Sequence, residues 1–208
     1  MPTFKGVKVF LLATERSRVY FATSDGEREE ELHGLKQAID KHIFAEDPDL
    51  TFAVLDGAAI PDLLEQLFAL QPQHECLYMG DLEPDMAEVA PYLVQLEPNS
   101  DFASWVIGLG WGKHWGIFLQ TSADFRAVRQ HLRRFLVTYS EEGRPLMFRF
   151  YDPRVLRVHL TKCKPEELQA LFGPVANYVV EDEDPKAALK FTLDSGALKP
   201  ERLSLNER

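Results

Sequence analysis

The stretch Leu50-Thr-Phe-Ala-Val-Leu-Asp-Gly57 decides the fold class of this chain. Its first six residues are almost all apolar and long enough for a buried strand, and Asp56-Gly57 is typical of the turn that ends one. A helix pattern follows, with Pro61 suited to its first turn. Its apolar residues recur at helical spacing: Ile60, Leu63, Leu64, Leu67 and Phe68. A buried strand followed directly by an amphipathic helix predicts an α/β fold.

The alternation of strands and helices continues along the chain. Strands are predicted over residues 75–79, 91–96, 114–120, 145–151, 176–181 and 187–193. Helices are predicted after Ser100, after Ser122 and after Asp152, and over residues 165–172. Since no convincing helix separates residues 75–79 from 91–96, we expect mixed strand directions. The predicted architecture is a layered mixed β-sheet flanked by helices.

The predicted domain organisation has three parts. Residues 1–46 form an N-terminal β-rich and helical extension, with strands over 7–12 and 19–23 and a helix that carries Leu32, Leu35, Ile39 and Ile43. Residues 47–194 form the α/β domain. Residues 195–208 are a polar tail that we expect to be frayed.

Composition argues against several classes of protein. The formal net charge of -10 over 208 residues is unfavourable for nucleic-acid binding. No apolar run approaches the ~20 residues that a membrane-spanning helix needs. Cys76 and Cys163 stand without a second ligand at metal spacing, and a core of this size needs no disulfide. We therefore expect a cytoplasmic protein that binds neither nucleic acid nor membrane.

The search for a catalytic or phosphate-binding motif is mostly negative. Asp56 follows a buried strand, where α/β enzymes place carboxylates, but no second carboxylate matches it, so support of the turn at Gly57 is favoured. The glycine-rich residues 108–112 lie between a predicted helix and a strand, which is the wrong order for a phosphate loop. A turn lined by Trp111 and Trp115 is favoured there, and these two tryptophans, together with the arginines described below, are the candidate partner-binding residues. The sequence therefore shows no recognisable active site and no metal site.

His114 has no recognisable nucleophile motif. A triad could still assemble from His114, Asp152 and Ser104, although nothing in the sequence favours it.

Arginines recur along one predicted helix face. Residues 121–139 carry Arg126, Arg129, Arg133 and Arg134 against the single acid Asp124, a local charge of +3. Either these arginines are solvated and paired with the protein's own acids, or they dock an acidic partner segment. Under the docking hypothesis, reversing Arg126, Arg129 and Arg133 to glutamate weakens one partner interaction and leaves the fold intact.

A second charged feature is the corner at residues 148–154. Asp152 directly precedes Pro153, which predicts a capped helix start. Arg149 and Arg154 bracket that acid and could pair with it to fix the corner. The alternative is that the corner presents a charged site to a partner or ligand.

At this corner the sequence resembles a known family. Phe148-Arg-Phe-Tyr-Asp-Pro-Arg-Val-Leu156 is similar to the signature of a large bacterial family of unknown-function domains that serve as type VI secretion effector adaptors. Further similar stretches follow the order expected for that family: residues 54–58, 74–78, 88–94, 110–118, 131–135, 165–168 and 172–174. Lys164 departs from the pattern, where a better helix cap would be expected.

The resemblance implies a non-enzymatic adaptor without a cofactor. Such a protein binds a cargo effector and hands it to the trimeric VgrG-type spike protein. Two alternatives stay open. One is a small ligand-binding or hydrolytic α/β enzyme that uses Asp56, His114 and the corner of Arg149, Asp152 and Arg154. The other is a structural subunit of the secretion machine.

Overall fold

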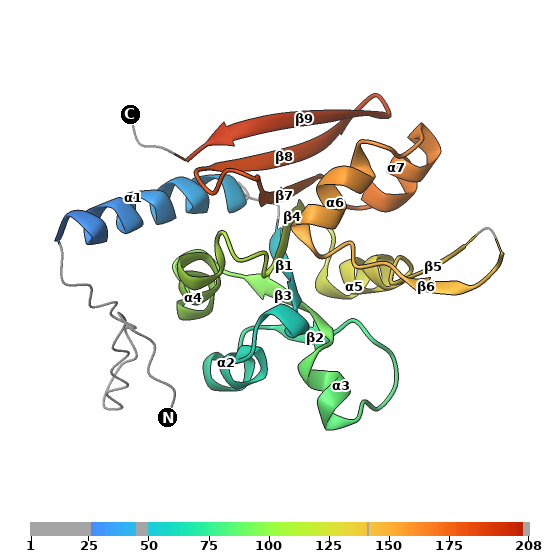
Figure 1. The fold of residues 1–208 in the computed structure, drawn as a ribbon, viewed down its shortest axis with the longest axis horizontal. Helices are drawn as coiled ribbons and strands as arrows, with labels where there is room; N and C mark the ends of the chain where they lie inside the picture. Colours follow the sequence, from blue (N-terminus) through green and yellow to red (C-terminus); the bar gives the residue numbers. More distant parts are fainter. Residues whose placement is uncertain (1–25, 45–49, 141, 206–208) are drawn as a thin grey trace.

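A seven-stranded sheet forms the centre of the computed structural model, which describes residues 26–44, 50–140 and 142–205 (Figure 1). The strand order is β2-β3-β1-β4-β7-β8-β9. The strands are β1 (Leu50–Asp56), β2 (His74–Cys76), β3 (Pro91–Leu96), β4 (Gly116–Thr121), β7 (Asn177–Glu181), β8 (Ala187–Asp194) and β9 (Ala197–Ser204). A separate two-stranded sheet joins β5 (Val137–Tyr139) to β6 (Pro145–Met147). The α/β fold class is confirmed.

Every strand pair in the described residues is antiparallel, so the expectation of mixed directions is wrong. The connection from β2 to β3 contains the short helix α3 (Pro84–Glu88) and joins antiparallel neighbours. The longer helical connection from β3 to β4 gives no parallel neighbours either, because β1 lies between these two strands and runs opposite to both. The predicted strands at 7–12 and 19–23, and the predicted domain boundary near residues 45–49, lie outside the described residues.

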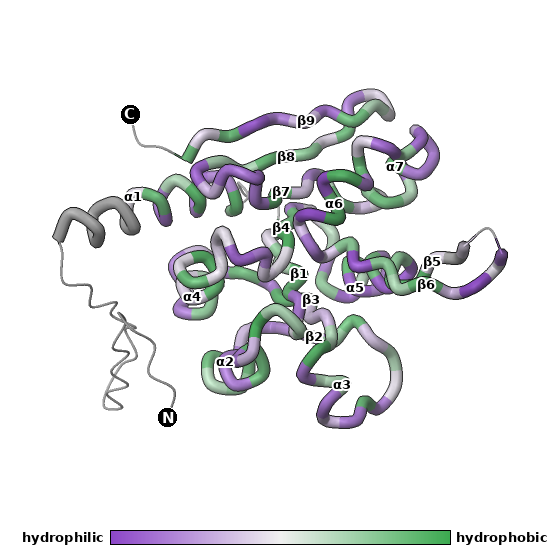
Figure 2. The backbone as a smooth tube through the Cα atoms, viewed as in Figure 1, coloured by the Kyte–Doolittle hydropathy of each residue, from purple (hydrophilic) through white to green (hydrophobic). Residues whose placement is uncertain are grey.

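Helices cover both faces of the sheet (Figure 1). Helices α1 (Gly26–Ile43), α2 (Leu63–Leu70) and α4 (Asp101–Gly110) pack on one face, and α5 (Phe125–Arg133), α6 (Pro153–Leu160) and α7 (Pro165–Phe172) pack on the other. Ala53 and Leu55 of β1 face the first group, whereas Phe52 and Val54 face the second. Two covered faces explain why β1 is a continuous apolar run. Figure 2 shows hydrophobic and hydrophilic stretches alternating along the flanking helices.

Helix α1 packs in the same core as the sheet. Ile39 and Ile43 are buried in the cluster that includes α2 and α4. The buried Gln120 side chain of β4 donates from Nε2 to the Ile43 carbonyl oxygen (2.7 Å) and accepts from Asn177 Nδ2 of β7 (2.7 Å). The C-terminal end of the predicted extension is therefore fixed to the centre of the sheet.

The region around α5 differs from its prediction. Asp124, and not Ser122, caps this helix by accepting a hydrogen bond from Ala127 N (2.8 Å). The helix ends at Arg133 after nine residues, and the chain continues into β5. Helix α2 likewise begins later than expected. Its N-cap is Asp62, so Pro61 lies before the helix and not in its first turn.

The predicted strand at 145–151 also needs correction. Only Pro145–Met147 is strand, in the small sheet. In a strand over 145–151, successive side chains would point to opposite faces. This alternation does not continue to the end of the segment, because the neighbouring Phe150 and Tyr151 are both buried. Both side chains belong to the core cluster on the side of α5, α6 and α7. They directly precede Asp152, which is the N-cap of α6.

The expectation of a frayed tail after residue 194 is wrong. Residues 197–204 form β9, which pairs with β8 from Asp194 opposite Ala197 to Ala187 opposite Ser204. The two strands meet at a tight turn in which Ser195 and Gly196 have φ values of 52° and 84°. The sequence of β9 is polar because β9 is an edge strand, and charged residues and proline at an edge discourage pairing with a strand of another molecule. None of the helices in these described ranges has the length and hydropathy to cross a membrane.

Candidate functional site

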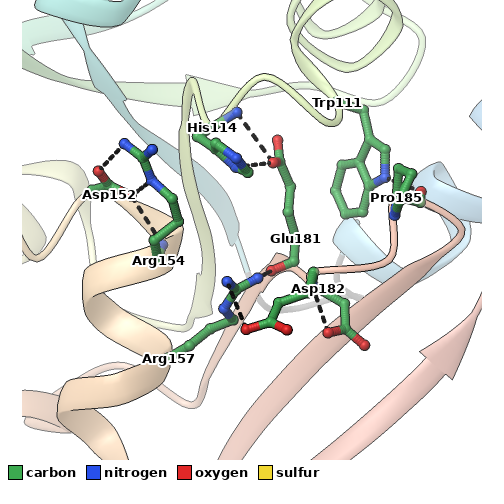
Figure 3. A network of polar contacts seen from close by, with 9 residues as sticks. Trp111, His114, Asp152, Arg154, Arg157, Glu181, Asp182 and Pro185 are labelled. Atoms are coloured by element: carbon green, nitrogen blue, oxygen red, sulfur yellow. Dashed lines mark hydrogen bonds and ion pairs between the residues drawn. The ribbon is translucent and has the colours of Figure 1, made fainter.

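The described residues contain three buried carboxylates, which lie in one region of the structure. Asp56 ends β1, Asp152 precedes α6 and Glu181 ends β7, and each side chain is at most 8% exposed. A basic side chain that reaches solvent pairs with each of them. We call this set the buried-acid corner; its members are Asp56, Asp152, Glu181, Arg149, Arg154 and His114, four of which Figure 3 shows.

Asp56 links the end of β1 to the segment before α6. Its Oδ1 accepts a hydrogen bond from Ala58 N (3.2 Å), and its Oδ2 accepts from Arg149 Nη2. The next residue, Gly57, donates from its backbone N to the Ala90 carbonyl oxygen (3.0 Å). A Cβ atom at Gly57 would lie 2.5 Å from the carbonyl oxygens of both Glu88 and Ala90, so the close approach of these segments requires glycine.

Asp152 caps α6 and binds Arg154 in a bidentate pair. Oδ1 accepts from the backbone N (2.9 Å) and Nε (3.0 Å) of Arg154, and Oδ2 accepts from Nη2 (2.7 Å). Burial raises the pKa of Asp152, but the hydrogen bonds and positive charge of Arg154 outweigh burial and hold this pKa below its ordinary value. The carboxylate therefore stays ionised inside the corner.

Replacing Arg154 with glutamine should make the fold more sensitive to acid. In the wild type the pKa of Asp152 is lower in the folded chain than in the unfolded chain. The resulting stability is present above the ordinary pKa of about 3.9 and is lost as pH falls through the folded value. Arg154→Gln leaves burial as the main influence, so we expect the unfolding midpoint in an acid titration followed by circular dichroism to move to higher pH. At pH 7 the loss should stay below about 1 kcal/mol, because Arg154 is more than half exposed.

Arg144→Gln is the matched control for this prediction. It removes a guanidinium that pairs with Glu142 (Nε to Oε2, 3.2 Å), and both side chains are largely exposed. Its acid midpoint should equal that of the wild type. An unchanged midpoint for Arg154→Gln as well would contradict the stabilising role of this pair.

Glu181 and His114 form the third pair, across 67 positions of sequence. Glu181 Oε2 accepts from the backbone N of His114 (3.1 Å) and lies 2.8 Å from its Nδ1. Burial raises the pKa of Glu181, and the His114 charge and hydrogen bonds oppose that shift. His114 has a φ of 60°, in the left-handed region that histidine, asparagine and aspartate adopt more often than other non-glycine residues. Arg157 of α6 donates from Nη1 to the Glu181 carbonyl oxygen (2.9 Å), which adds a further link (Figure 3).

The triad considered from the sequence is not assembled. The His114 ring bonds to Glu181, whereas both carboxylate oxygens of Asp152 accept from Arg154 (Figure 3). Among the described residues, the His114 ring hydrogen-bonds to no serine or cysteine. Asp56, His114 and the Arg149, Asp152 and Arg154 corner do share a neighbourhood, but each acid there has its own basic partner.

The arginines of α5 divide into two pairs. Arg133 donates to three backbone carbonyl oxygens at the end of β2 and directly after it: those of Cys76 (3.2 Å), Leu77 (3.0 Å) and Tyr78 (2.7 Å). Arg129 pairs with Glu75 (Nη2 to Oε2, 2.9 Å). Arg126 and Arg134 are exposed, and no ion pair or hydrogen bond joins either side chain to another side chain of the described segments. The expectation that Arg133 can be reversed without harm to the fold is therefore inconsistent with its contacts.

Trp111 and Trp115 do not lie with these arginines. Both pack against the α2 and α4 side of the core, on the face of the sheet opposite α5. The ring centroid of Trp115 lies 5.0 Å from that of Trp105, and Trp111 Nε1 donates to the Pro185 carbonyl oxygen (2.9 Å) (Figure 3). The six predicted partner-binding residues thus occupy two separate surfaces.

Glu181 and Arg157 are members of the site region that the sequence did not reveal. Glu181 is an acid that directly follows the apolar residues Val179 and Val180 at the end of β7, and this position was a usable signal. Its partner could not be found, because nothing local connects it to His114. The part of the chain seen in the structure contains no group of three His, Cys, Asp or Glu side chains placed to hold a metal ion.

Comparison with known families identifies the chain. A family model described as a domain of unknown function, DUF4123, matches residues 51–170, which is more than half of the sequence. The chain belongs to the DUF4123 family. The DUF4123 segment holds Asp56, His114, the Asp152 motif and all of α5, whereas Glu181 lies beyond its end. No curated protein and no solved structure shows significant similarity to the chain.

Proposed function

We propose that this DUF4123 protein is a type VI secretion adaptor that acts in the cytoplasm. In this role it binds a cognate toxic effector and loads it onto the VgrG-type spike protein before secretion. Support comes from the ordered set of family stretches in the sequence, with the Asp152 motif as one of the two longest, and from the DUF4123 match that spans most of them. Partner binding, and not chemical conversion of a substrate, is the proposed activity.

One structural observation favours binding over catalysis. The buried acids, which are the candidates for acid–base chemistry, are each engaged by a basic partner from their own chain. A general base needs a lone pair within reach of a substrate proton, and at least one oxygen of each of these carboxylates already accepts from a basic side chain of the same chain. The exposed arginines Arg126 and Arg134, in contrast, point their charge outward from α5. The polar groups thus fix the fold at the corner and leave α5 open to a partner.

Co-purification tests the proposal directly. The tagged full-length chain is co-expressed with the products of the genes next to its own, where we expect a spike gene upstream and a large toxin gene downstream. The adaptor should retain the toxin in a complex stable to size-exclusion chromatography, and should also bind the spike protein. Binding to neither product would refute the proposal.

Two other outcomes would support other functions. A metabolite retained by the purified chain in native mass spectrometry would favour the ligand-binding or enzymatic alternative built on the buried-acid corner. A chain found in fixed stoichiometry with the secreted spike after firing would be a structural subunit of the machine. An adaptor should instead stay in the cytoplasmic fraction.

A further inference from the structure

The surface beside α5 contains an open depression. Its volume is about 490 Å³, and it lies between α5 and the segment that follows β2. We call it the arginine depression. Its lining residues are Met79, Arg126, Arg129, Gln130, Arg133 and Arg134.

Two of these arginines are held in place by the protein itself. Arg133 is fixed by the carbonyl oxygens of residues 76–78, and Arg129 by Glu75. Carbonyl oxygens are dipoles without net charge, so the Arg133 charge is not neutralised by its three hydrogen bonds. The carboxylate of Glu75 offsets the charge of Arg129, so Arg133 supplies the positive charge of this fixed side of the depression.

The remaining lining residues are available to a partner. Arg126 and Arg134 are exposed at the rim without an ion pair to another residue in the described ranges. Met79 is 78% exposed and is the apolar side chain of the lining. Exposed methionine is common at binding surfaces because its flexible side chain adapts to different contacts. Positive charge and an apolar contact therefore lie together on a chain whose formal charge is -10.

We propose that the arginine depression binds an acidic segment of a partner protein that also carries an apolar side chain. The carboxylates pair with Arg126 and Arg134, and the apolar side chain packs on Met79. This inference rests on the proposed function, because cargo or spike would supply the segment. Bidentate pairing of arginine with carboxylates gives such a contact its specificity.

The spacing of the two arginines restricts the partner sequence. Positions eight residues apart along a helix are separated by about 12 Å. An extended segment advances ~3.3 Å per residue, so carboxylates three or four positions apart reach both arginines. The apolar residue then lies between the acids. A nucleic acid suits this surface less well, because two free arginines release few counterions and the rest of the chain is acidic.

A synthetic peptide tests the proposal. The probe is a fluorescein-labelled Ser-Glu-Glu-Leu-Glu-Glu-Ser peptide, and its anisotropy is measured against the full-length chain at low salt. We expect saturable binding that falls at least about tenfold in the Arg126→Gln/Arg134→Gln double variant. Replacing the peptide leucine with serine, or Met79 with serine, should weaken binding several-fold. The Lys162→Gln/Lys199→Gln variant removes the same charge from exposed positions elsewhere and should bind like the wild type.

Other results would overturn the inference. These are an absence of saturable peptide binding, equal binding by wild type and the double arginine variant, or tighter binding of a 20-base-pair DNA duplex than of the peptide. Should the arginine variant lose its native circular dichroism spectrum, Met79→Ser decides the question alone. If the neighbouring gene products co-purify but the peptide does not bind, this surface assignment fails and the adaptor proposal stands. If the peptide binds but neither product co-purifies, the adaptor proposal fails.

Discussion

Gly57→Ala is expected to lower the free energy of unfolding by about 3–5 kcal/mol, at or above the upper end of the usual cost of overpacking. The new Cβ would meet two backbone carbonyl oxygens at 2.5 Å, and the Val89 carbonyl carbon at 3.0 Å. Backbone atoms cannot move aside as a flexible side chain can. The segment after α3 would have to separate from the end of β1, and the hydrogen bond from Gly57 N to the Ala90 oxygen would be lost.

Gly80→Ala is the control for this experiment. Gly80 has a φ of 85°, but no atom lies within 4 Å of the position its Cβ would take. Gly80→Ala adds the same methyl group without a steric clash, so only the positive φ should lower the free energy of unfolding, by about 1 kcal/mol. Chemical denaturation of both variants separates the two effects. A Gly57→Ala variant no less stable than Gly80→Ala would show that the two segments do not approach as described.

The second large effect is expected at Arg133. Arg133→Met keeps most of the side-chain volume but removes the hydrogen-bond donors to three carbonyl oxygens in a partly buried site. We expect a loss of about 2–4 kcal/mol, since hydrogen bonds to a charged donor contribute more than neutral ones. The end of β2, which is the edge strand of the sheet, should also exchange its amide hydrogens faster.

The same substitution at Arg126 is the matched comparison. Arg126 lies two turns earlier on α5, is exposed, and has no ion pair within the ranges that the structure describes. Arg126→Met should therefore change the free energy of unfolding by no more than about 0.5 kcal/mol. Urea unfolding followed by fluorescence measures both variants. Equal stabilities would show that the Arg133 contacts contribute little to the fold.

Local patterns made much of the fold predictable. The apolar run of β1, the Ser100 cap of α4 and the Gly-Pro stop after α7 are determined by neighbours in sequence, and each appears as expected. The strand β9 was missed for a physical reason. An edge strand buries little, so Pro200, Glu201 and Arg202 give it the composition of a solvated tail. Its pairing with β8 depends on a turn at Ser195-Gly196 that sequence pattern did not reveal.

The candidate site was less predictable than the fold. Arg154 and Asp152 are two positions apart, so their pairing follows from local geometry. Arg133 and the carbonyl oxygens that it binds are 55–57 positions apart, and Glu181 lies 67 positions from His114. Such contacts depend on the complete strand order. A helical stripe of arginines looks the same in sequence whether its members face solvent or the protein's own backbone.

The position of β7 has a consequence for how this family should be delimited. The strand begins seven residues after the DUF4123 match ends, yet it pairs with β4 over Phe118–Gln120, and its Tyr178 is completely buried. Helix α1 lies before the match and still accepts a hydrogen bond from Gln120. The segment that sequence comparison recognises is therefore only the middle of a longer cooperative unit. A fragment trimmed to that segment would carry an open sheet edge and an uncovered core into solution.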